Sequence, residues 1–209
     1  MTLHVLIPCK SLGDGKTRLA QTLDAKTRRA LCTSFLRRTL DVALALVPPP
    51  RCHVIAGDGE AAAIAGARGV TPCDDPGTGL NEALRQGRER IRRSAREELA
   101  LLIVPIDLPW ATAAALDELV RSPADVVIVP DRRRVGTNAL YLGPRAARRF
   151  VFRFGANSFA AHQCATGHGL RVEVYEDARL SFDVDCPEDY LEWQQSEGSW
   201  RCQSARTSE

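Results

Sequence analysis

Short aliphatic runs alternate along the chain with longer segments in which apolar residues recur every three or four positions. The first pattern predicts buried strands and the second predicts amphipathic helices. Their alternation is typical of a parallel or mixed α/β sheet. The predicted strands cover residues 3–8, 52–56, 69–71, 99–104, 126–129, 139–142, 171–175 and 181–184, and the predicted helices cover 25–46, 60–67, 80–96, 112–120, 144–150, 158–167 and 187–195.

The domain organisation is simple. A chain of 209 residues has the length of one domain with a substantial buried core. No internal repeat or low-complexity linker interrupts the α/β pattern, whereas the segment after residue 195 is polar and lacks apolar periodicity. We therefore expect one domain over residues 1–195 and a flexible C-terminal tail over 196–209.

Composition narrows the class of protein. The net charge is only +2, which gives no reason to expect nucleic acid or a membrane as a partner. The seven cysteines are widely spaced, without a C-x-x-C pair, so they favour neither a disulfide framework nor a zinc site. No signal peptide and no apolar run long enough to cross a bilayer is visible. These features predict a cytoplasmic protein.

The loop after the first predicted strand contains two glycines and three basic residues, Lys10, Lys16 and Arg18. In α/β sheets, loops at the carboxyl ends of strands bind ligands, so a basic loop there favours an anion. The alternative is a solvated loop in an arginine-rich chain. The loop alone does not decide between the two interpretations.

Carboxylates also follow predicted strands. Asp107 follows the most continuous aliphatic run after Pro105 and Ile106, and Thr112 is a better candidate than Asp107 to cap the next helix. Asp183 and Asp185 alternate on an extended segment and are expected to face the same side. Asp185 is also a candidate cap for the helix that begins at Pro187. Together the three carboxylates would form an oxygen-rich site suited to Mg²⁺.

Three glycine-containing segments are candidate ligand clamps. They are residues 77–81, 136–138 and 154–158, and the first and last of them precede predicted helices. Free amides at such helix starts can bind an anion or a nucleobase, and Ser158 is a candidate N-cap. Taken singly, each segment is also compatible with ordinary turn chemistry.

The order of these motifs resembles the phospholactate guanylyltransferase family, whose members act in the biosynthesis of coenzyme F-420. The resemblance covers residues 3–195. It is carried by K-S-L-x-x-x-K-T-R-L (10–19), G-L-N-x-A-L (79–84), D-L-P (107–109), G-T-N-A-L (136–140), F-G-x-x-S-F-x-x-H (154–162) and D-V-D-x-P-E-D (183–189).

This resemblance implies a Rossmann-like three-layer α/β/α nucleotidyltransferase fold with a mostly parallel mixed sheet. It also implies transfer of GMP from GTP to 2-phospho-L-lactate, phosphoenolpyruvate or 3-phospho-D-glycerate, with release of pyrophosphate. Cys9, where relatives often carry a small aliphatic residue, and the basic loop 131–135 depart from the family pattern and leave the choice of acid open.

Residue roles follow from the same resemblance. Asp107, Asp183 and Asp185 would hold Mg²⁺, and Lys16, Arg18 and Asp107 would be catalytic. The acid substrate would contact Thr137, Asn138, Gly155 and Ser158. The nucleotide would contact Lys10, Lys16, Gly79, Leu80 and Asn81.

We therefore expect GTP and a phosphorylated three-carbon acid as ligands, with the next enzyme of the pathway and a second copy of the chain as candidate protein partners. Two alternatives remain open. One is a nucleotidyltransferase of the same fold that acts on molybdopterin or a sugar phosphate. The other is a non-catalytic nucleotide-binding protein.

Overall fold

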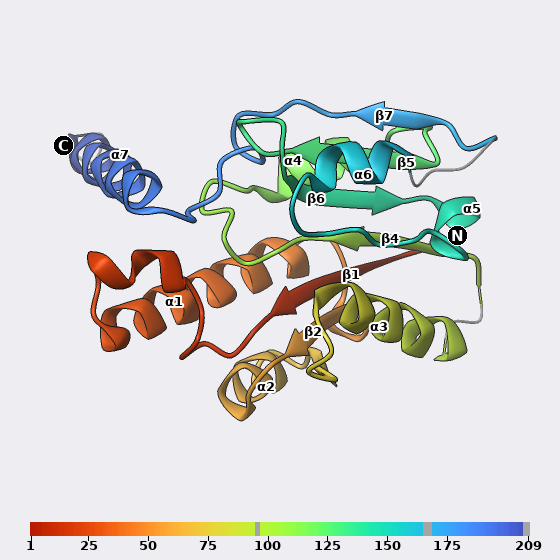
Figure 1. Ribbon diagram of the computed structural model, residues 1–209, viewed down its shortest axis with the longest axis horizontal. Helices are drawn as coiled ribbons and strands as arrows, with labels where there is room; N and C mark the ends of the chain where they lie inside the picture. The colour runs from red at the N-terminus through yellow and green to blue at the C-terminus, as the bar shows by residue number, and fades with distance from the viewer. Residues whose placement is uncertain (95–96, 165–168, 207–209) are drawn as a thin grey trace.

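A seven-stranded mixed sheet forms the centre of the molecule (Figure 1). The computed structural model describes residues 1–94, 97–164 and 169–206, with side chains as far as residue 196. The strands lie in the order β3-β2-β1-β4-β6-β5-β7, and β6 runs antiparallel to both of its neighbours. Their bounds are β1 Thr2–Cys9, β2 Cys52–Ala56, β3 Thr71–Asp74, β4 Leu99–Ile103, β5 Val126–Pro130, β6 Thr137–Leu142 and β7 Val172–Val174.

Helices cover both faces of this sheet. Side chains of α1, α2 and α4 share one apolar core with one face, and side chains of α3, α5 and α6 share a second core with the other. The predicted three-layer α/β/α arrangement is confirmed. The helices are α1 Ala25–Leu44, α2 Gly59–Gly66, α3 Leu80–Ser94, α4 Ala113–Val120, α5 Pro144–Ala147, α6 Ser158–Cys164 and α7 Pro187–Arg206, with short 3-10 helices at Thr17–Gln21 and Pro49–Arg51.

Strand directions bring distant loops to one edge of the sheet. β1, β2 and β4 are parallel, so the loops that follow them leave the sheet on the same side. Because β6 is antiparallel, it is its first residues, rather than its last, that lie at this edge. The loops after Cys9 and Ile103 and the start of β6 at Thr137 thereby become neighbours in space.

The structure corrects several predicted elements. Residues 181–184 do not form a strand. They have no regular secondary structure, and Phe182 and Val184 are buried in a third apolar cluster with residues of α1 and α7. Helix α7 continues to Arg206, past the end predicted at residue 195. Helix α6 begins at Ser158, so this serine is the first helical residue and not the cap.

Candidate active site

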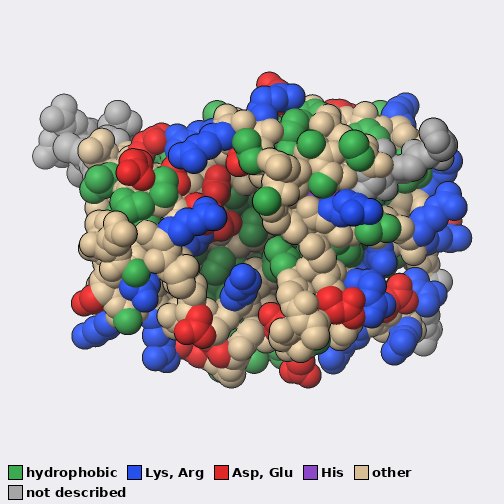
Figure 2. All heavy atoms as spheres, in the orientation of Figure 1, with side chains coloured by type: hydrophobic (Ala, Val, Ile, Leu, Met, Phe, Trp, Pro, Cys, Tyr) green, Lys and Arg blue, Asp and Glu red, His purple; other side chains and the backbone are tan. Residues whose placement is uncertain are grey.

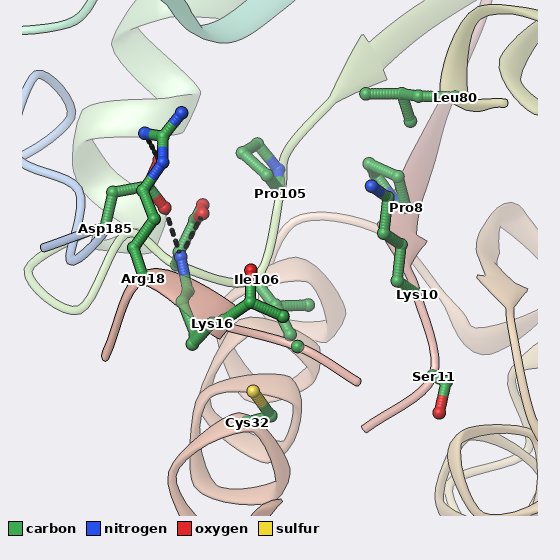
Figure 3. Close-up of a pocket in the computed structure, with 13 residues that line it drawn as sticks. Pro8, Lys10, Ser11, Lys16, Arg18, Cys32, Leu80, Pro105, Ile106 and Asp185 are labelled. Atoms are coloured by element: carbon green, nitrogen blue, oxygen red, sulfur yellow. Dashed lines mark hydrogen bonds and ion pairs between the residues drawn. The ribbon is translucent and has the colours of Figure 1, made fainter. Parts of the chain in front are cut away.

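A cavity of about 410 Å³ lies at the edge where the loops after β1 and β4 meet. Its lining includes Lys10, Lys16, Arg18, Asp107 and Asp185. On the face drawn in Figure 2, basic side chains border a hollow that has acidic side chains in its wall. In the close-up of Figure 3, Lys10 and Lys16 lie on opposite sides of this cavity. The basic loop thus partly encircles a space of a size suited to a small ligand.

Two contacts fix the path of the basic loop. The carboxylate of Asp58 caps α2 by accepting from the amide of Ala61 at 2.8 Å, and its other oxygen accepts from the amide of Leu12 at 2.7 Å. Gly15 passes so close to α1 that a Cβ there would lie 2.8 Å from the sulfur of Cys32. A side chain at position 15 would therefore push the loop away from the helix.

Lys16 is the centre of the site. Its ammonium lies 2.6 Å from Asp107 Oδ2 and 2.7 Å from Asp185 Oδ1, and Figure 3 draws Lys16 and Asp185 facing each other. Only 8% of the Lys16 side chain is exposed. Burial alone would lower the pKa of Lys16, but the charges of Asp107 and Asp185 outweigh burial and raise that pKa above its ordinary value. The lysine is therefore a permanent cation that joins two distant loops. Arg18 extends the basic group, with its guanidinium 3.4 Å from Asp185.

The backbone at Lys16 is strained. Its φ of 55° and ψ of 42° lie in the left-handed region, which disfavours residues with a Cβ. Such a conformation costs about 1–3 kcal/mol and persists only where surrounding contacts determine it. Here the two ion pairs supply those contacts.

Asp107 reaches the site from the end of β4. The following helix α4 is capped by Thr112, whose hydroxyl accepts from the amide of Ala115 at 3.2 Å. This agrees with the prediction that Asp107 is not needed as a cap. The carbonyl of Asp107 accepts a hydrogen bond from the amide of Val184 at 3.1 Å. The β4 loop and the segment that carries the other two aspartates are thus directly connected.

Asp185 is also free of the capping role considered as its alternative. The carboxylate of Asp189, in the first turn of α7, accepts from the amides of Asp185 and Cys186 at 3.0 and 2.9 Å. In a capping box, the side chain of the third helical residue accepts from the backbone amide of the N-cap residue, and Asp189 makes this contact to Cys186. Asp189 thereby holds the start of α7, and the Asp185 side chain remains available to Lys16.

An aromatic contact supports the same segment. The ring of Phe182 stacks on Trp110, with centroids 3.8 Å apart, and the guanidinium of Arg132 lies 4.4 Å from the centre of the Phe182 ring. Arg132 also donates to Asp189 at 2.8 Å. Segment 181–185 is therefore held by these side-chain contacts and by single backbone hydrogen bonds, such as that from Val184 to Asp107, instead of a strand ladder.

Asp183 is the third carboxylate of this group. It accepts from the side-chain amide of Asn138 at 3.3 Å, and Asn138 also donates to the carbonyl of Leu180 at 3.1 Å. Burial, followed by the charges of Asp107 and Asp185, raises the pKa of Asp183 to about 6. Asn138, predicted to contact the acid, thus contacts one of the predicted metal ligands.

The donor set is suited to a hard divalent cation, because every candidate ligand is a carboxylate oxygen. Within the described part of the chain, however, no three acidic, histidine or cysteine residues are already arranged around one metal position. Asp107 and Asp185 instead share the Lys16 ammonium. One or two carboxylates suffice for Mg²⁺ when phosphate oxygens and water complete its coordination, so the residues present fit the ion.

The remaining predicted residues lie outside the lining of this cavity, apart from Leu80. The side chain of Asn81 is engaged elsewhere: it accepts from the amide of Phe154 at 2.7 Å and donates to the carbonyl of Phe154 at 2.9 Å. It therefore ties the 77–81 turn to the 154–158 turn. Gly155, with φ 131°, has a backbone conformation suited to glycine.

Thr137 is buried and paired with a histidine that the sequence left without a definite role. Its hydroxyl lies 2.9 Å from Nδ1 of His162, which has no exposed surface. Thus the sequence signalled Thr137, Asn138 and Asn81 as members of glycine-containing motifs. It carried no signal for which partner each side chain contacts, nor for the supporting role of Asp189.

Sequence and structure comparisons decide the family. The family described as "Guanylyl transferase CofC like" matches residues 3–197. This chain belongs to the guanylyl transferase CofC-like family. The match confirms the relationship to guanylyltransferases that the motifs predicted. The chain is therefore a nucleotidyltransferase.

Individual relatives agree with this assignment. A phosphoenolpyruvate guanylyltransferase of Sphaerobacter thermophilus is 39% identical over 196 residues, with 92% of each chain covered. One of Rubrobacter xylanophilus is 38% identical over 205 residues, covering 95% of this chain and 96% of the relative. A solved nucleotidyl transferase from a Methanothermobacter species superimposes with a TM-score of 0.67 at 16% identity, covering 93% of this chain and 96% of the other, and shows the shared fold.

Where the structure describes the chain, no helix is both long and apolar enough to span a bilayer.

Proposed function

We propose that this protein joins GMP from GTP to a phosphorylated three-carbon acid and releases pyrophosphate, as a step of coenzyme F-420 biosynthesis. Phosphoenolpyruvate is the first acid to test, because the two relatives described above carry that name. The observation that carries the proposal is the Lys16 ammonium held between Asp107 and Asp185 in a cavity bordered by basic side chains. Family membership alone would also suit a chain that had lost this group.

The reaction requires two anions to approach each other. A phosphate oxygen of the acid attacks the α-phosphorus of GTP, a new P–O bond forms, and the bond from the α-phosphorus to the bridging oxygen of the β-phosphate breaks. The attacking phosphate is already ionised near neutral pH, so no general base is needed. Catalysis then consists mainly of orientation and neutralisation of charge.

The chain has groups suited to both tasks. Lys16 and Arg18 would bind phosphate oxygens and stabilise the charge that develops on pyrophosphate, and Lys10 faces the same cavity from its other side. Asp107, Asp183 and Asp185 would hold Mg²⁺, which when bound neutralises triphosphate charge. Lys16 contacts one oxygen of each of Asp107 and Asp185, so either carboxylate could hold such an ion through its other oxygen.

The second group of residues would bind the acid. Thr137 pairs with His162 on α6, and this helix begins at Ser158, just after the turn that contains Gly155. Gly79 and Leu80 would contact the nucleotide, with Asn81 holding their turn against Phe154. The two substrates would thus meet at the sheet edge where β1, β4 and β6 bring their loops together.

The test is pyrophosphate release by the purified protein with GTP and Mg²⁺, with each of the three acids in turn. Mass analysis identifies the product, and CTP, UTP, molybdopterin and a sugar phosphate are run alongside. We expect turnover with GTP and at least one of the acids. Release only with another acceptor would support the alternative enzyme, and GTP binding without release for any acceptor would indicate a non-catalytic protein.

A further inference from the structure

His162 connects the two parts of the chain that carry the predicted acid contacts, β6 and the turn leading into α6. It sits on α6 with no exposed surface, and both ring nitrogens have partners. Nδ1 is 2.9 Å from the hydroxyl oxygen of Thr137 on β6, and Nε2 is 2.9 Å from the backbone nitrogen of Arg153. One imidazole therefore connects β6, α6 and the segment that leads into Gly155.

These contacts determine which nitrogen carries the proton. A backbone N–H can only donate, so Nε2 of His162 accepts from Arg153 and carries no hydrogen. Burial, followed by the charge of Arg153, lowers the pKa of His162 to about 4, so the ring is neutral near pH 7. The single ring hydrogen must then be on Nδ1, which donates to the Thr137 hydroxyl oxygen.

The direction of that bond matters for Thr137. A hydroxyl has one hydrogen and two acceptor positions. Because His162 occupies an acceptor position, the hydrogen of the Thr137 hydroxyl remains available to donate to an anion. A histidine with the opposite tautomer would instead accept that hydrogen and present an oxygen lone pair to the ligand.

The surroundings hold the ring in place. Phe154 contacts it edge-on, with centroids 4.7 Å apart and an interplanar angle of 75°, and Phe150 lies 5.6 Å away by the same measure. Asn81 binds both backbone polar groups of Phe154, directly after the Arg153 amide that His162 holds. Two side chains thus fix consecutive peptide units just before Gly155.

We propose that His162 is a positioning residue of the acid pocket: it sets the Thr137 hydroxyl as a donor toward the phosphorylated acid and fixes the backbone that leads to Gly155 beside it. This inference rests on the proposed function, because it concerns the binding of that acid. It differs from a purely structural role for the histidine in predicting a selective effect on one of the two substrates.

Two conservative variants separate the two bonds. In His162→Asn the side-chain amide nitrogen can take the place of Nδ1 and donate to Thr137, whereas the Arg153 amide loses its acceptor. In His162→Gln the amide oxygen can take the place of Nε2 and accept from Arg153, whereas Thr137 loses its donor. His162→Phe removes both bonds and keeps a ring.

We expect each conservative variant to raise the KM for the acid by about 5- to 10-fold, and His162→Phe by more, with the KM for GTP within about twofold of wild type. The matched control is His53→Gln, another buried histidine, on β2, whose ring pairs with that of His4. It should leave both KM values unchanged. Equal increases in both KM values for the His162 variants would overturn the proposal.

A double mutant tests whether His162 acts through Thr137. Thr137→Val removes the hydroxyl and keeps the branched shape, so adding His162→Gln to it should raise the acid KM by less than about twofold. Multiplication of the two single effects would show that the histidine acts independently and would overturn the proposal.

One measurement does not depend on turnover. Nitrogen-15 NMR of the histidine side chains reports which ring nitrogen is protonated. A proton on Nδ1 of His162 supports the proposal, and a proton on Nε2 overturns it. Failure of the wild type to release pyrophosphate with any acid would instead overturn the proposed function and leave the tautomer result standing.

Discussion

The ammonium of Lys16 lies 2.6 Å from the carboxylate of Asp107, although 91 residues separate them in the chain. Both residues follow strands of the same parallel group, β1 and β4, which pair directly. The contact therefore arises from strand order, and Asp185, from the irregular segment before α7, adds a second carboxylate to the same ammonium. One cation and two carboxylates from distant parts of the chain thus share a single edge of the sheet.

Loss of one carboxylate charge tests the metal assignment. We expect Asp107→Asn and Asp183→Asn each to lower turnover by at least about 100-fold, because a neutral amide weakens binding of a divalent cation. The control is Asp117→Asn on α4, which removes a carboxylate paired with the exposed Arg121. Initial rates of pyrophosphate release across a Mg²⁺ titration provide the measurement. Near-normal turnover of either variant at saturating Mg²⁺ would contradict the assignment.

The left-handed backbone of Lys16 predicts an unusual order of stabilities. Lys16→Ala and Lys16→Gly both lose the two ion pairs and should both lose activity. Only glycine relieves the backbone strain, so Lys16→Gly should be the more stable of the two by about 1 kcal/mol. Urea denaturation measures the difference. The control is the exposed helical position Arg37, where Arg37→Ala should be more stable than Arg37→Gly by about 1 kcal/mol. If the alanine variant were the more stable at both positions, the backbone of Lys16 would not be strained.

Asp189 is expected to act on the site without contacting substrate. Its buried carboxylate accepts from two backbone amides, so Asp189→Ala should reduce the free energy of unfolding by about 1–3 kcal/mol and lower turnover by displacing Asp185. Glu192→Ala is the matched control, because Glu192 also pairs with Arg132 but is half exposed. Thermal unfolding and steady-state rates, measured together, test the idea. Equal effects of the two substitutions would show that the Arg132 pairing alone matters.

Much of the fold was predictable because burial leaves a local pattern. The run at 52–56 was predicted with the bounds that the structure gives for β2, and 99–104 differs from β4 by one residue. Segment 181–184 was predicted wrongly as a strand. Its alternating apolar residues are buried, as a strand's would be, but they pack against Trp110, α1 and α7. Alternation reveals that side chains are buried and not which surface buries them.

For the site, the sequence predicted which charged residues take part but not what each polar side chain contacts. Strand ends and charge type pointed to Lys16, Asp107 and Asp185, which the structure brings into contact. Asn81 and His162 also lie in motifs that carry the family resemblance. In the structure, however, the side chain of each is bonded to other parts of the chain: Asn81 to the backbone of Phe154, and His162 to the backbone of Arg153. A motif records that a polar residue occurs at a position. Whether it faces a ligand or supports a residue that does is fixed by packing between distant segments.

The buried histidines predict how stability depends on pH. Burial lowers the pKa of His53 to about 4, aided by the charges of His4 and Arg90, and it also lowers the pKa of His4, which lies 3.0 Å away. The pKa of His162 is lowered to about 4. The unfolded chain binds protons at these histidines near pH 6.5 and the folded protein does not. Their contribution to stability is therefore fully present above pH 6.5 and is lost as the pH falls toward 4.

One carboxyl group acts in the opposite direction. The raised pKa of Asp183, about 6, favours the folded state as the pH falls below that value. This gain in stability offsets the loss from one histidine, and the loss from the other histidines remains. The free energy of unfolding should therefore decrease between pH 6.5 and 4.5, with each uncompensated histidine adding a slope of at most about 1.4 kcal/mol per pH unit. Urea midpoints measured across this range provide the test, and His53→Gln should flatten the decrease. A stability that stays constant or rises on acidification would mean that the histidine pair is protonated in the folded protein.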